Sequence, residues 1–291
     1  MAAYAAAAIM NEQIISFTHV EKTGGITLET LLRRHFGLRH LDVMTRHGWR
    51  YTAQDLAADL RLHPGLKSIS GHWLRPFIDY APFNDRLVWY TMLREPVSRY
   101  ISQYQHVVEK RGYNKGFDAY LGDKSQSNWQ VNKLAGEWDA EAARQIVNER
   151  FCCVGLLEEY NTSLLLFREA LRIPGFRVAY GKPRNPARSG AVRREIMNRM
   201  DEYKERVHEN NALDIELYNH VREHIFPKQV ARYGAERMQR DLATEFQTPK
   251  STAREYLNEK ANDLVRRTVY RMIVRARARR AQRTGIPYVR K

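Results

Sequence analysis

A short segment near the start of the chain combines the residue types that bind anions. It lies between an apolar run that begins at Ile14 and a stretch with helical spacing of leucines, and it reads Lys22-Thr23-Gly24-Gly25-Ile26-Thr27. Backbone N–H groups in a glycine turn at a helix N-terminus bind phosphate or sulfate, and the lysine and threonine side chains add donors. We therefore predict an anion-binding loop to which all these residues contribute. The alternative is an ordinary strand-to-helix turn with a solvated lysine, because short motifs also occur by chance.

The order of residues narrows the kind of anion site. A Walker A loop places its lysine after the glycines, and a dinucleotide fingerprint has the glycine pattern GxGxxG. In this chain the lysine comes before the glycines. The loop therefore matches neither pattern.

An arginine and a serine eight positions apart form a second candidate phosphate site. Arg94 directly follows the apolar run 87–93, and Pro96 begins a stretch with helical spacing that contains Ser102. A guanidinium can bind phosphate through paired hydrogen bonds, and a serine hydroxyl adds another donor. We predict that Arg94 and Ser102 bind one phosphate group, with Arg99 assisting.

His72 is the candidate general base. It follows the run 67–70 and Gly71, and open α/β sheets keep their active-site groups just past the ends of strands. An imidazole with an unperturbed pKa of about 6.5 accepts a proton near neutral pH. The alternative role for His72 is a hydrogen bond to a loop carbonyl. Glu29, in the first helical turn beside the loop, is the fallback base.

These residues require a scaffold of alternating strands and helices. Strands are predicted from Ile14 onward and over 67–70, 87–93 and 151–157, and helices over 52–62, 140–148, 191–208 and 212–224 and after Pro96. Residues 37–50 show no clear period and are predicted to form a loop. The fold class that follows is α/β, with a mostly parallel sheet flanked by helices.

The composition fits a globular protein with anionic partners. The chain has 291 residues, 43% of them hydrophobic, and a formal net charge of +15, which points to nucleotides, acidic glycans, nucleic acid or a membrane surface. The adjacent Cys152 and Cys153 cannot form a disulfide framework, and both are expected to be core thiols. No metal-ligand spacing is visible, so no metal is expected. Because neither a signal peptide nor a membrane span is visible, we expect a cytoplasmic protein.

The C-terminal segment has a different character. Residues 260–291 hold eleven basic residues and a single acidic one, Asp263, which accounts for ten of the fifteen net positive charges. Thr252 and Glu255 have capping-box spacing, and a helical stripe follows that consists of Leu257, Ala261, Leu264, Val265, Thr268 and Met272. Such a helix can contact an anionic membrane surface, bind an acidic polymer or partner, or pack its stripe on the body. Nucleic acid is not an expected partner, because no recognition motif accompanies the charge.

Several fragments together resemble sulfotransferases that use 3′-phosphoadenosine 5′-phosphosulfate (PAPS). The lysine-first loop resembles their 5′-phosphosulfate loop, and residues 93–104 resemble their 3′-phosphate motif. The closest likeness is to the carbohydrate branch that contains the heparan and dermatan/chondroitin 2-O-sulfotransferases. It rests also on Ser70-Gly71-His72 and on the segments 128–136 and 151–171, and it covers roughly residues 14–232.

The resemblance implies a P-loop-like fold, PAPS as donor and His72 as base. It also implies that Lys182 and Arg184 help to bind the nucleotide, since they lie in a loop whose counterpart closes over it. Ser70 stands where the 2-O-sulfotransferases have the first histidine of a His-x-His pair. The implied organisation is a sulfotransferase domain at 11–234 and a basic helical C-terminal extension at 235–291.

The function expected from the sequence is sulfuryl transfer from PAPS to a carbohydrate hydroxyl, on a polysaccharide, a glycolipid or a sugar. Lys22 would stabilise the leaving phosphate, the residues from Lys22 to Thr27 would bind the 5′-phosphosulfate, and no metal would be needed. The alternatives are a nucleotide kinase or NTPase with a P-loop-like site, and a non-catalytic basic module that binds glycans or a membrane surface. Peripheral membrane contact through the basic C-terminal helix remains an option in each case.

Overall fold

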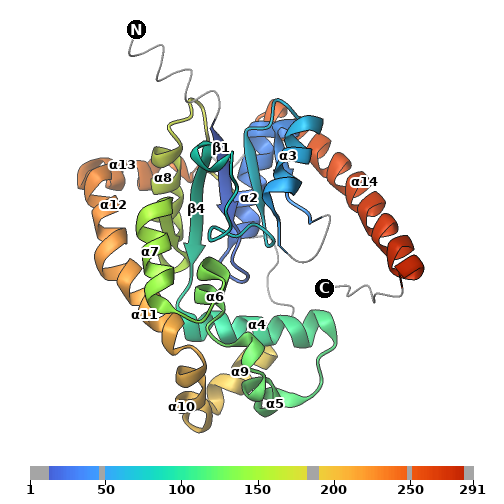
Figure 1. Cartoon of the computed structure of the whole chain (residues 1–291). Coiled ribbons are helices and arrows are strands. Elements are labelled where there is room, and N and C mark those ends of the chain that lie inside the picture. Colours follow the sequence, from blue (N-terminus) through green and yellow to red (C-terminus); the bar gives the residue numbers. More distant parts are fainter. Residues whose placement is uncertain (1–12, 46–49, 182–189, 248–250, 285–291) are drawn as a thin grey trace.

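Five parallel strands form a single sheet at the centre of the molecule (Figure 1). The structure is a computed structural model that describes residues 13–45, 50–181, 190–247 and 251–284, with side chains described up to residue 268 and at Met272. The strand order is β2-β3-β1-β4-β5. The strands are β1 (Ile14–Thr18), β2 (His40–Asp42), β3 (Ser68–Gly71), β4 (Leu87–Leu93) and β5 (Phe151–Leu156).

The strand order places β1 at a topological switch point. After β1 the chain crosses β3 to reach β2, and after β3 it crosses β1 to reach β4. Residues of β1 pair in parallel with β3 on one side and β4 on the other. Ligands of open α/β sheets bind beyond the carboxyl ends of the strands at such a point. The loops that follow β1, β3 and β4 therefore meet at one edge of the sheet.

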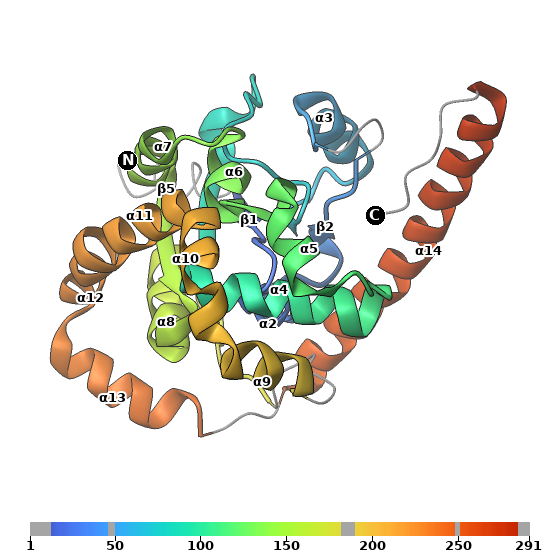
Figure 2. The ribbon, with the colours of Figure 1, turned by 90° about the horizontal axis from the view of Figure 1, so that it is seen from below.

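Helices cover both faces of the sheet and its carboxyl end (Figures 1 and 2). In the first half of the chain they are α2 (Gly25–Phe36), α3 (Ala53–Leu62), α4 (Pro96–Arg111), α5 (Gly116–Gly122), α6 (Trp129–Ala135) and α7 (Ala140–Arg150). In the second half they are α8 (Tyr160–Leu171), α9 (Ala191–Asn198), α10 (Met200–Asn210), α11 (Ala212–His220), α12 (Phe226–Tyr233), α13 (Ala235–Glu245) and α14 (Ala253–Thr284). A π-helical turn, Val221–Ile225, joins α11 to α12.

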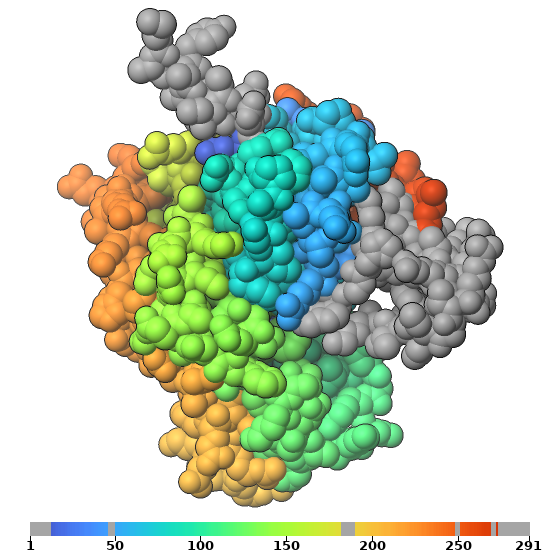
Figure 3. Space-filling model, in the orientation of Figure 1, coloured from blue at the N-terminus to red at the C-terminus, as the bar shows by residue number. Residues whose placement is uncertain are grey.

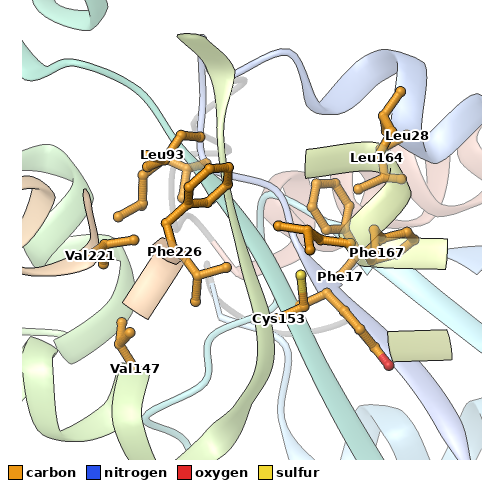
Figure 4. Packing of buried hydrophobic residues seen from close by; sticks show 14 of the residues in the cluster. Phe17, Leu28, Leu93, Val147, Cys153, Leu164, Phe167, Val221 and Phe226 are labelled. Carbon is orange, nitrogen blue, oxygen red and sulfur yellow. The ribbon is translucent and has the colours of Figure 1, made fainter. Parts of the chain in front are cut away.

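Alternation along the central strands sends neighbouring side chains into different hydrophobic clusters. Ile15 and Phe17 of β1 join the cluster that also contains Leu28 and Phe167 (Figure 4). Ile14 belongs instead to a second cluster on the other face, packed with α3. Because both faces of the sheet are buried, β1, β4 and β5 are mainly apolar runs, as is usual in parallel sheets. The short strands β2 and β3 contain buried polar residues instead.

A third cluster of aromatic side chains joins the helices at the carboxyl end of the sheet. It unites α4, α5, α9 and α10 through residues such as Tyr100, Phe117 and Tyr203. This lobe forms the lower part of the molecule in Figures 1 and 3. It gives α4 a rigid support directly beyond the end of β4.

Several sequence predictions are confirmed and three are wrong. The strand 87–93 coincides with β4, and α3 begins at a capping box formed by Thr52 and Asp55. Residues 37–50 are not all loop, since His40–Asp42 pairs with β3 as an edge strand. The His40 imidazole contacts the hydroxyls of Ser68 and Ser70 at 3.0 and 3.3 Å. These polar contacts stabilise a strand that apolar patterning does not reveal.

The other two errors concern a helix and a cysteine. The helix predicted over 191–208 is divided into α9 and α10 at Arg199, whose backbone leaves the helical conformation (φ −111°, ψ 21°). Cys153 is a buried free thiol as expected, but Cys152 is exposed. Residues 151 and 152 precede the buried part of β5, which begins at Cys153.

Helix α14 packs along α2 and the edge of the sheet through polar side chains. The predicted capping box forms, since Thr252 N–H donates to Glu255 Oε2 (2.7 Å) and Glu255 N–H donates to Thr252 Oγ1 (3.2 Å). Asn262 Nδ2 donates to the carbonyl oxygens of Gly37 (2.9 Å) and His40 (2.8 Å). The predicted apolar stripe does not cover the body, because Leu257, Leu264 and Met272 are 66%, 69% and 65% exposed.

Candidate functional site

The loop between β1 and α2 has the backbone of a tight anion-binding turn. Lys22 has φ 71° and Gly24 has φ 80°, so two left-handed residues reverse the chain within three positions. Helix α2 begins at Gly25 without a side-chain cap and without an acidic residue in its first turn. An uncapped helix N-terminus presents N–H groups and a positive dipole end toward the carboxyl edge of the sheet. A non-glycine residue in the left-handed region is uncommon and often marks a functional position.

Both glycines of the loop are required by close packing. A Cβ atom at Gly25 would lie 2.3–2.8 Å from atoms of the His19 ring, and one at Gly24 would lie 2.8 Å from Leu157 Cδ1. The Tyr160 hydroxyl donates to the Gly24 carbonyl oxygen (3.1 Å). Helix α8, which carries Tyr160, thus holds the loop from one side.

The two threonines of the loop have different surroundings. Thr23 is buried, and its hydroxyl donates to the carbonyl oxygen of Val20 (2.9 Å). Thr27 is half-buried in the first turn of α2, near the Tyr160 hydroxyl. Thr23 therefore closes the loop, while its backbone and Thr27 remain at the edge where an anion would bind. Ile26 is exposed there.

Arg94, predicted to bind a separate phosphate, contacts this same loop. Its Nη1 donates to the carbonyl oxygen of Lys22 (3.1 Å). The backbone of Arg94 is clamped by the buried Gln130, whose side chain accepts from Arg94 N (3.0 Å) and donates to Arg94 O (2.9 Å). Two candidate anion-binding cations, which lie 72 residues apart in the sequence, are thereby brought together.

The electrostatic environment of these cations favours an anion. Burial lowers the pKa of Lys22, and the nearby charge of Arg94 lowers it further. Burial also lowers the pKa of Arg94, and the charge of Arg193 on α9 adds to this effect. Each cation destabilises its neighbour, so a phosphate or sulfate placed among them would relieve the repulsion. Arg193 was not singled out from the sequence, because only the fold brings α9 to this position.

Ser102 lies on α4, half-buried, two turns beyond Arg94. Among the residues that the structure describes, no hydrogen bond joins Ser102 to Arg94. The N-terminus of α4 is capped by Glu95, whose side chain accepts from Val97 N (2.9 Å) and Ser98 N (2.7 Å). The joint grip of Arg94 and Ser102 on one phosphate stays a prediction.

His72 follows β3, and the Nδ1 atom of its ring faces the same loop. Its Nδ1 lies 2.9 Å from the carbonyl oxygen of His19 and 3.3 Å from Glu21 Oε1. A carbonyl oxygen and an ionised carboxylate can only accept hydrogen bonds. The proton of the neutral ring must therefore lie on Nδ1, which leaves the lone pair of Nε2 free. The side chain is 45% exposed. Burial of part of the ring and the adjacent His19 lower the pKa of His72 to about 4, against the opposing effect of Glu21.

A second histidine, missed in the sequence, lies against His72. The ring centroids of His19 and His72 are 4.2 Å apart. His19 Nδ1 lies 2.8 Å from Glu29 Oε1, and Glu29 also accepts from Arg33 Nη2 (3.3 Å). The fallback base Glu29 is thus buried behind His19 and paired on two sides. It does not lie in the first turn of α2 as predicted, because the helix begins at Gly25 and has no acidic residue in its first turn. His19 directly follows β1, whereas a His-x-His pair would place the second histidine at position 70, where Ser70 stands.

Glu21 was also missed, although it directly precedes Lys22. Its carboxylate accepts from Lys133 Nζ (3.0 and 3.2 Å) and from Trp129 Nε1 (2.6 Å). Burial alone would raise the pKa of Glu21, but Lys133 and His72 outweigh it and hold the pKa well below its usual range. No local sequence pattern identifies Glu21, because its main partner Lys133 lies 112 positions away in the sequence.

Two predicted nucleotide ligands, Lys182 and Arg184, lie outside the described residues, so their role stays a prediction. Among the described residues, no group of three or more His, Cys, Asp or Glu side chains could hold a metal ion. Over the same part of the chain, no helix has the length and apolar character to cross a membrane.

Comparisons with known proteins give no family for the chain. No protein-family model matches it, and no curated protein matches it at a significant level. The geometry of the site is therefore the basis for its function.

Proposed function

We propose that the protein transfers a sulfuryl group from PAPS to a hydroxyl of a carbohydrate acceptor, on a P-loop-like fold. The observation that carries this proposal is that two separate elements contact the β1–α2 loop through its backbone carbonyls. Arg94 donates to Lys22 O and His72 donates to His19 O. One loop thereby gathers a cationic anion site on one side and a neutral base on the other. Transfer between an anionic donor and a hydroxyl needs both.

We assign the candidate ligands to the two charged ends of PAPS. Lys22, the amides at the start of α2 and Thr27 suit the 5′-phosphosulfate, and Arg94 suits the 3′-phosphate together with Ser102. Thr23, Gly24, Gly25 and Ile26 supply the loop backbone, and Lys182 and Arg184 are proposed to add further contacts. The bound donor would supply the transferable sulfuryl group. The protein's own part is positioning, together with neutralisation of the charge on the leaving phosphate by Lys22.

His72 Nε2 would accept the proton of the acceptor hydroxyl as the new O–S bond forms. The electron pair of the broken S–O bond leaves with the 5′-phosphate, beside Lys22. Because its pKa lies below its usual value, His72 is neutral at physiological pH and its Nε2 lone pair is available, while the same shift makes the ring a weaker base.

The 3′-phosphate assignment is tested with Arg94→Ala. We expect this variant to weaken binding of the product 3′,5′-bisphosphate nucleotide (PAP) by about tenfold or more, because a charge-assisted contact is lost. Adenosine 5′-phosphosulfate, which lacks the 3′-phosphate, should bind with much less change. Isothermal titration calorimetry measures both, and Arg61→Ala on α3 is the control. Equal losses for the two nucleotides would contradict the assignment.

The activity itself is tested with PAPS and a panel of polysaccharides, glycolipids and sugars, with mass spectrometry to detect an added sulfate. Absence of transfer to every acceptor, with intact PAP binding, would favour a non-catalytic binding module. A thermal-shift comparison of PAP with ATP and Mg²⁺ separates the proposal from a nucleotide kinase or NTPase, since the true ligand stabilises the folded state.

We propose in addition that α14 contacts an anionic membrane surface. The supporting observation is that Leu257, Leu264 and Met272 are exposed on a helix with no acidic residue after Asp263. Interfacial helices combine apolar side chains with basic ones in this way. Exposed apolar residues favour lipid over nucleic acid, whose phosphates offer them no contact.

A further inference from the structure

We propose that Glu21 is a positioning residue for His72. Its carboxylate would share the Nδ1 proton of the imidazole with the carbonyl oxygen of His19. It would also stabilise the positive charge that develops when Nε2 accepts the acceptor's proton. This inference rests on the proposed function of His72 as a base. It adds a residue that no sequence motif indicated.

The contacts of His72 define what Glu21 can do. The backbone oxygen of His19 at 2.9 Å and Glu21 Oε1 at 3.3 Å both face Nδ1. The carbonyl is neutral, so it can orient the ring but adds little when the ring becomes charged. Glu21 is an anion at contact distance, and it favours the imidazolium directly.

Glu21 is itself fixed by groups that leave it little freedom. Lys133, which is fully buried, donates to both carboxylate oxygens, and the Trp129 indole donates to Oε2. The same Lys133 ammonium donates to the carbonyl oxygen of His72 (2.6 Å). One buried cation therefore fixes the carboxylate and the backbone of the histidine relative to each other. A pre-positioned carboxylate stabilises a developing charge without reorganisation.

Other charged groups near His72 act in both directions. His19 and Lys133 disfavour the protonated ring, whereas Glu21 and the more distant Glu29 favour it. Arg75 lies near enough to Glu21 to feel its charge. Glu29 is engaged by His19 and Arg33. Glu21 is thus the one carboxylate among these groups that contacts the His72 ring.

The proposal predicts an effect of Glu21→Gln on both rate and pH dependence. We expect kcat to fall by about ten- to a hundredfold, with the affinity for PAP changed less than about twofold. Loss of the negative charge should also lower the pKa of His72, so the acid limb of kcat/KM should move to lower pH. In a His72→Ala background the substitution should have little further effect, because the two residues act as a unit.

Two further variants guard against a general loss of structure. Glu21→Asp keeps the charge beside Lys133 but withdraws the carboxylate from Nδ1, and it should lower kcat in the same direction. Glu141→Gln removes an exposed carboxylate that pairs with Arg144 and should leave kcat unchanged. The kinetic measurements use PAPS and the acceptor identified in the panel.

Nitrogen-15 NMR titration of His72 in the full-length protein tests the inference without any substrate. We expect the Nδ1–H tautomer in the wild type and a lower pKa in Glu21→Gln. An Nε2–H tautomer, or an unchanged pKa in the variant, would overturn the role of Glu21 even if the enzyme transfers sulfate. The expected titration in a protein that transfers no sulfate would instead overturn the proposed function, and with it the catalytic meaning of the contact.

Discussion

Gly25 illustrates how single residues determine the candidate site. Its missing side chain is the space that the His19 imidazole occupies. That imidazole in turn lies against His72 and bonds Glu29. Gly25 was predicted from the sequence to belong to an anion-binding loop. The structure shows that the packing of the two histidines requires it as well.

Gly25→Ala should therefore disturb both stability and activity. The new methyl group would lie within 2.8 Å of the His19 ring, and forced overpacking of this kind costs about 1–3 kcal/mol. We expect a lower free energy of unfolding in urea and a large loss of kcat. Gly122→Ala, where a Cβ meets nothing within 4 Å, should change the free energy of unfolding by no more than about 0.5 kcal/mol. Equal behaviour of the two variants would refute the steric argument.

At this scale the sequence predicted where three candidate residues lie, but not which side chains they contact. Lys22, His72 and Arg94 do lie at one edge of the sheet, because each follows a parallel strand. His19 and Glu21 could not be selected, since their importance depends on contacts with residues 53 and 112 positions away, His72 and Lys133. Short motifs report what a residue can do locally, and the fold decides which neighbour it meets.

At the scale of elements, α14 shows that a helix can pack through amides rather than an apolar stripe. Asn258 Nδ2 donates to Arg34 O (2.9 Å), and Asn262 Nδ2 caps two carbonyls at the end of α2 and beyond. Arg34 Nε adds an ion pair with Glu259 (2.8 Å). These contacts satisfy the carbonyls at the C-terminus of α2, which the helix itself cannot satisfy. The helical period in the sequence identified α14, but not the side it would present to the body.

Asn262→Ala should loosen α14 without unfolding the sheet. Two buried carbonyl oxygens would lose their donor, at a cost of about 1–3 kcal/mol. We expect faster native-state hydrogen exchange in α14, with amides of β1 and β4 much less affected. Asn198→Ala, on an exposed position of α9, serves as the control. Uniform acceleration across the sheet would instead show that α14 unfolds only together with the core.

At the scale of the whole molecule, charge is concentrated at one end of the chain. Ten of the fifteen net positive charges belong to residues 260–291, and α14 extends along the side of the body (Figure 2). The remaining part of the chain is only mildly basic. The overall charge therefore describes the C-terminal segment more than the candidate site.

The proposed membrane contact predicts binding to vesicles that contain phosphatidylserine. Binding should be weak to pure phosphatidylcholine and should decrease with salt, because exposed charges are screened beyond about 10 Å at 0.1 M ionic strength. The double substitution Leu264→Glu and Met272→Glu should reduce co-sedimentation several-fold. Leu62→Glu, at a residue 69% exposed on α3, is the control. Undiminished binding of the double variant would exclude α14 as the contact surface.

The α/β architecture was accessible from sequence because its longer strands, β1, β4 and β5, are mainly apolar runs separated by helical periods. The order of the strands in the sheet could not be predicted, because it depends on which strands each connection passes over. The edge strand β2 was missed because three residues with a buried histidine carry almost no periodic signal. Nonlocal pairing, rather than local propensity, holds it in place.

Two backbone carbonyl groups of the β1–α2 loop connect the binding of the two proposed substrates. His19 O holds the candidate base and Lys22 O holds the candidate phosphate ligand, three residues apart on one strained turn. If a nucleotide binds there as proposed, any shift that it imposes on the turn also moves the anchor of His72. Thermodynamic reciprocity then requires an acceptor that engages His72 to alter the hold on the nucleotide by the same factor. The turn would make the affinities for donor and acceptor depend on each other, although the two substrates contact different side chains.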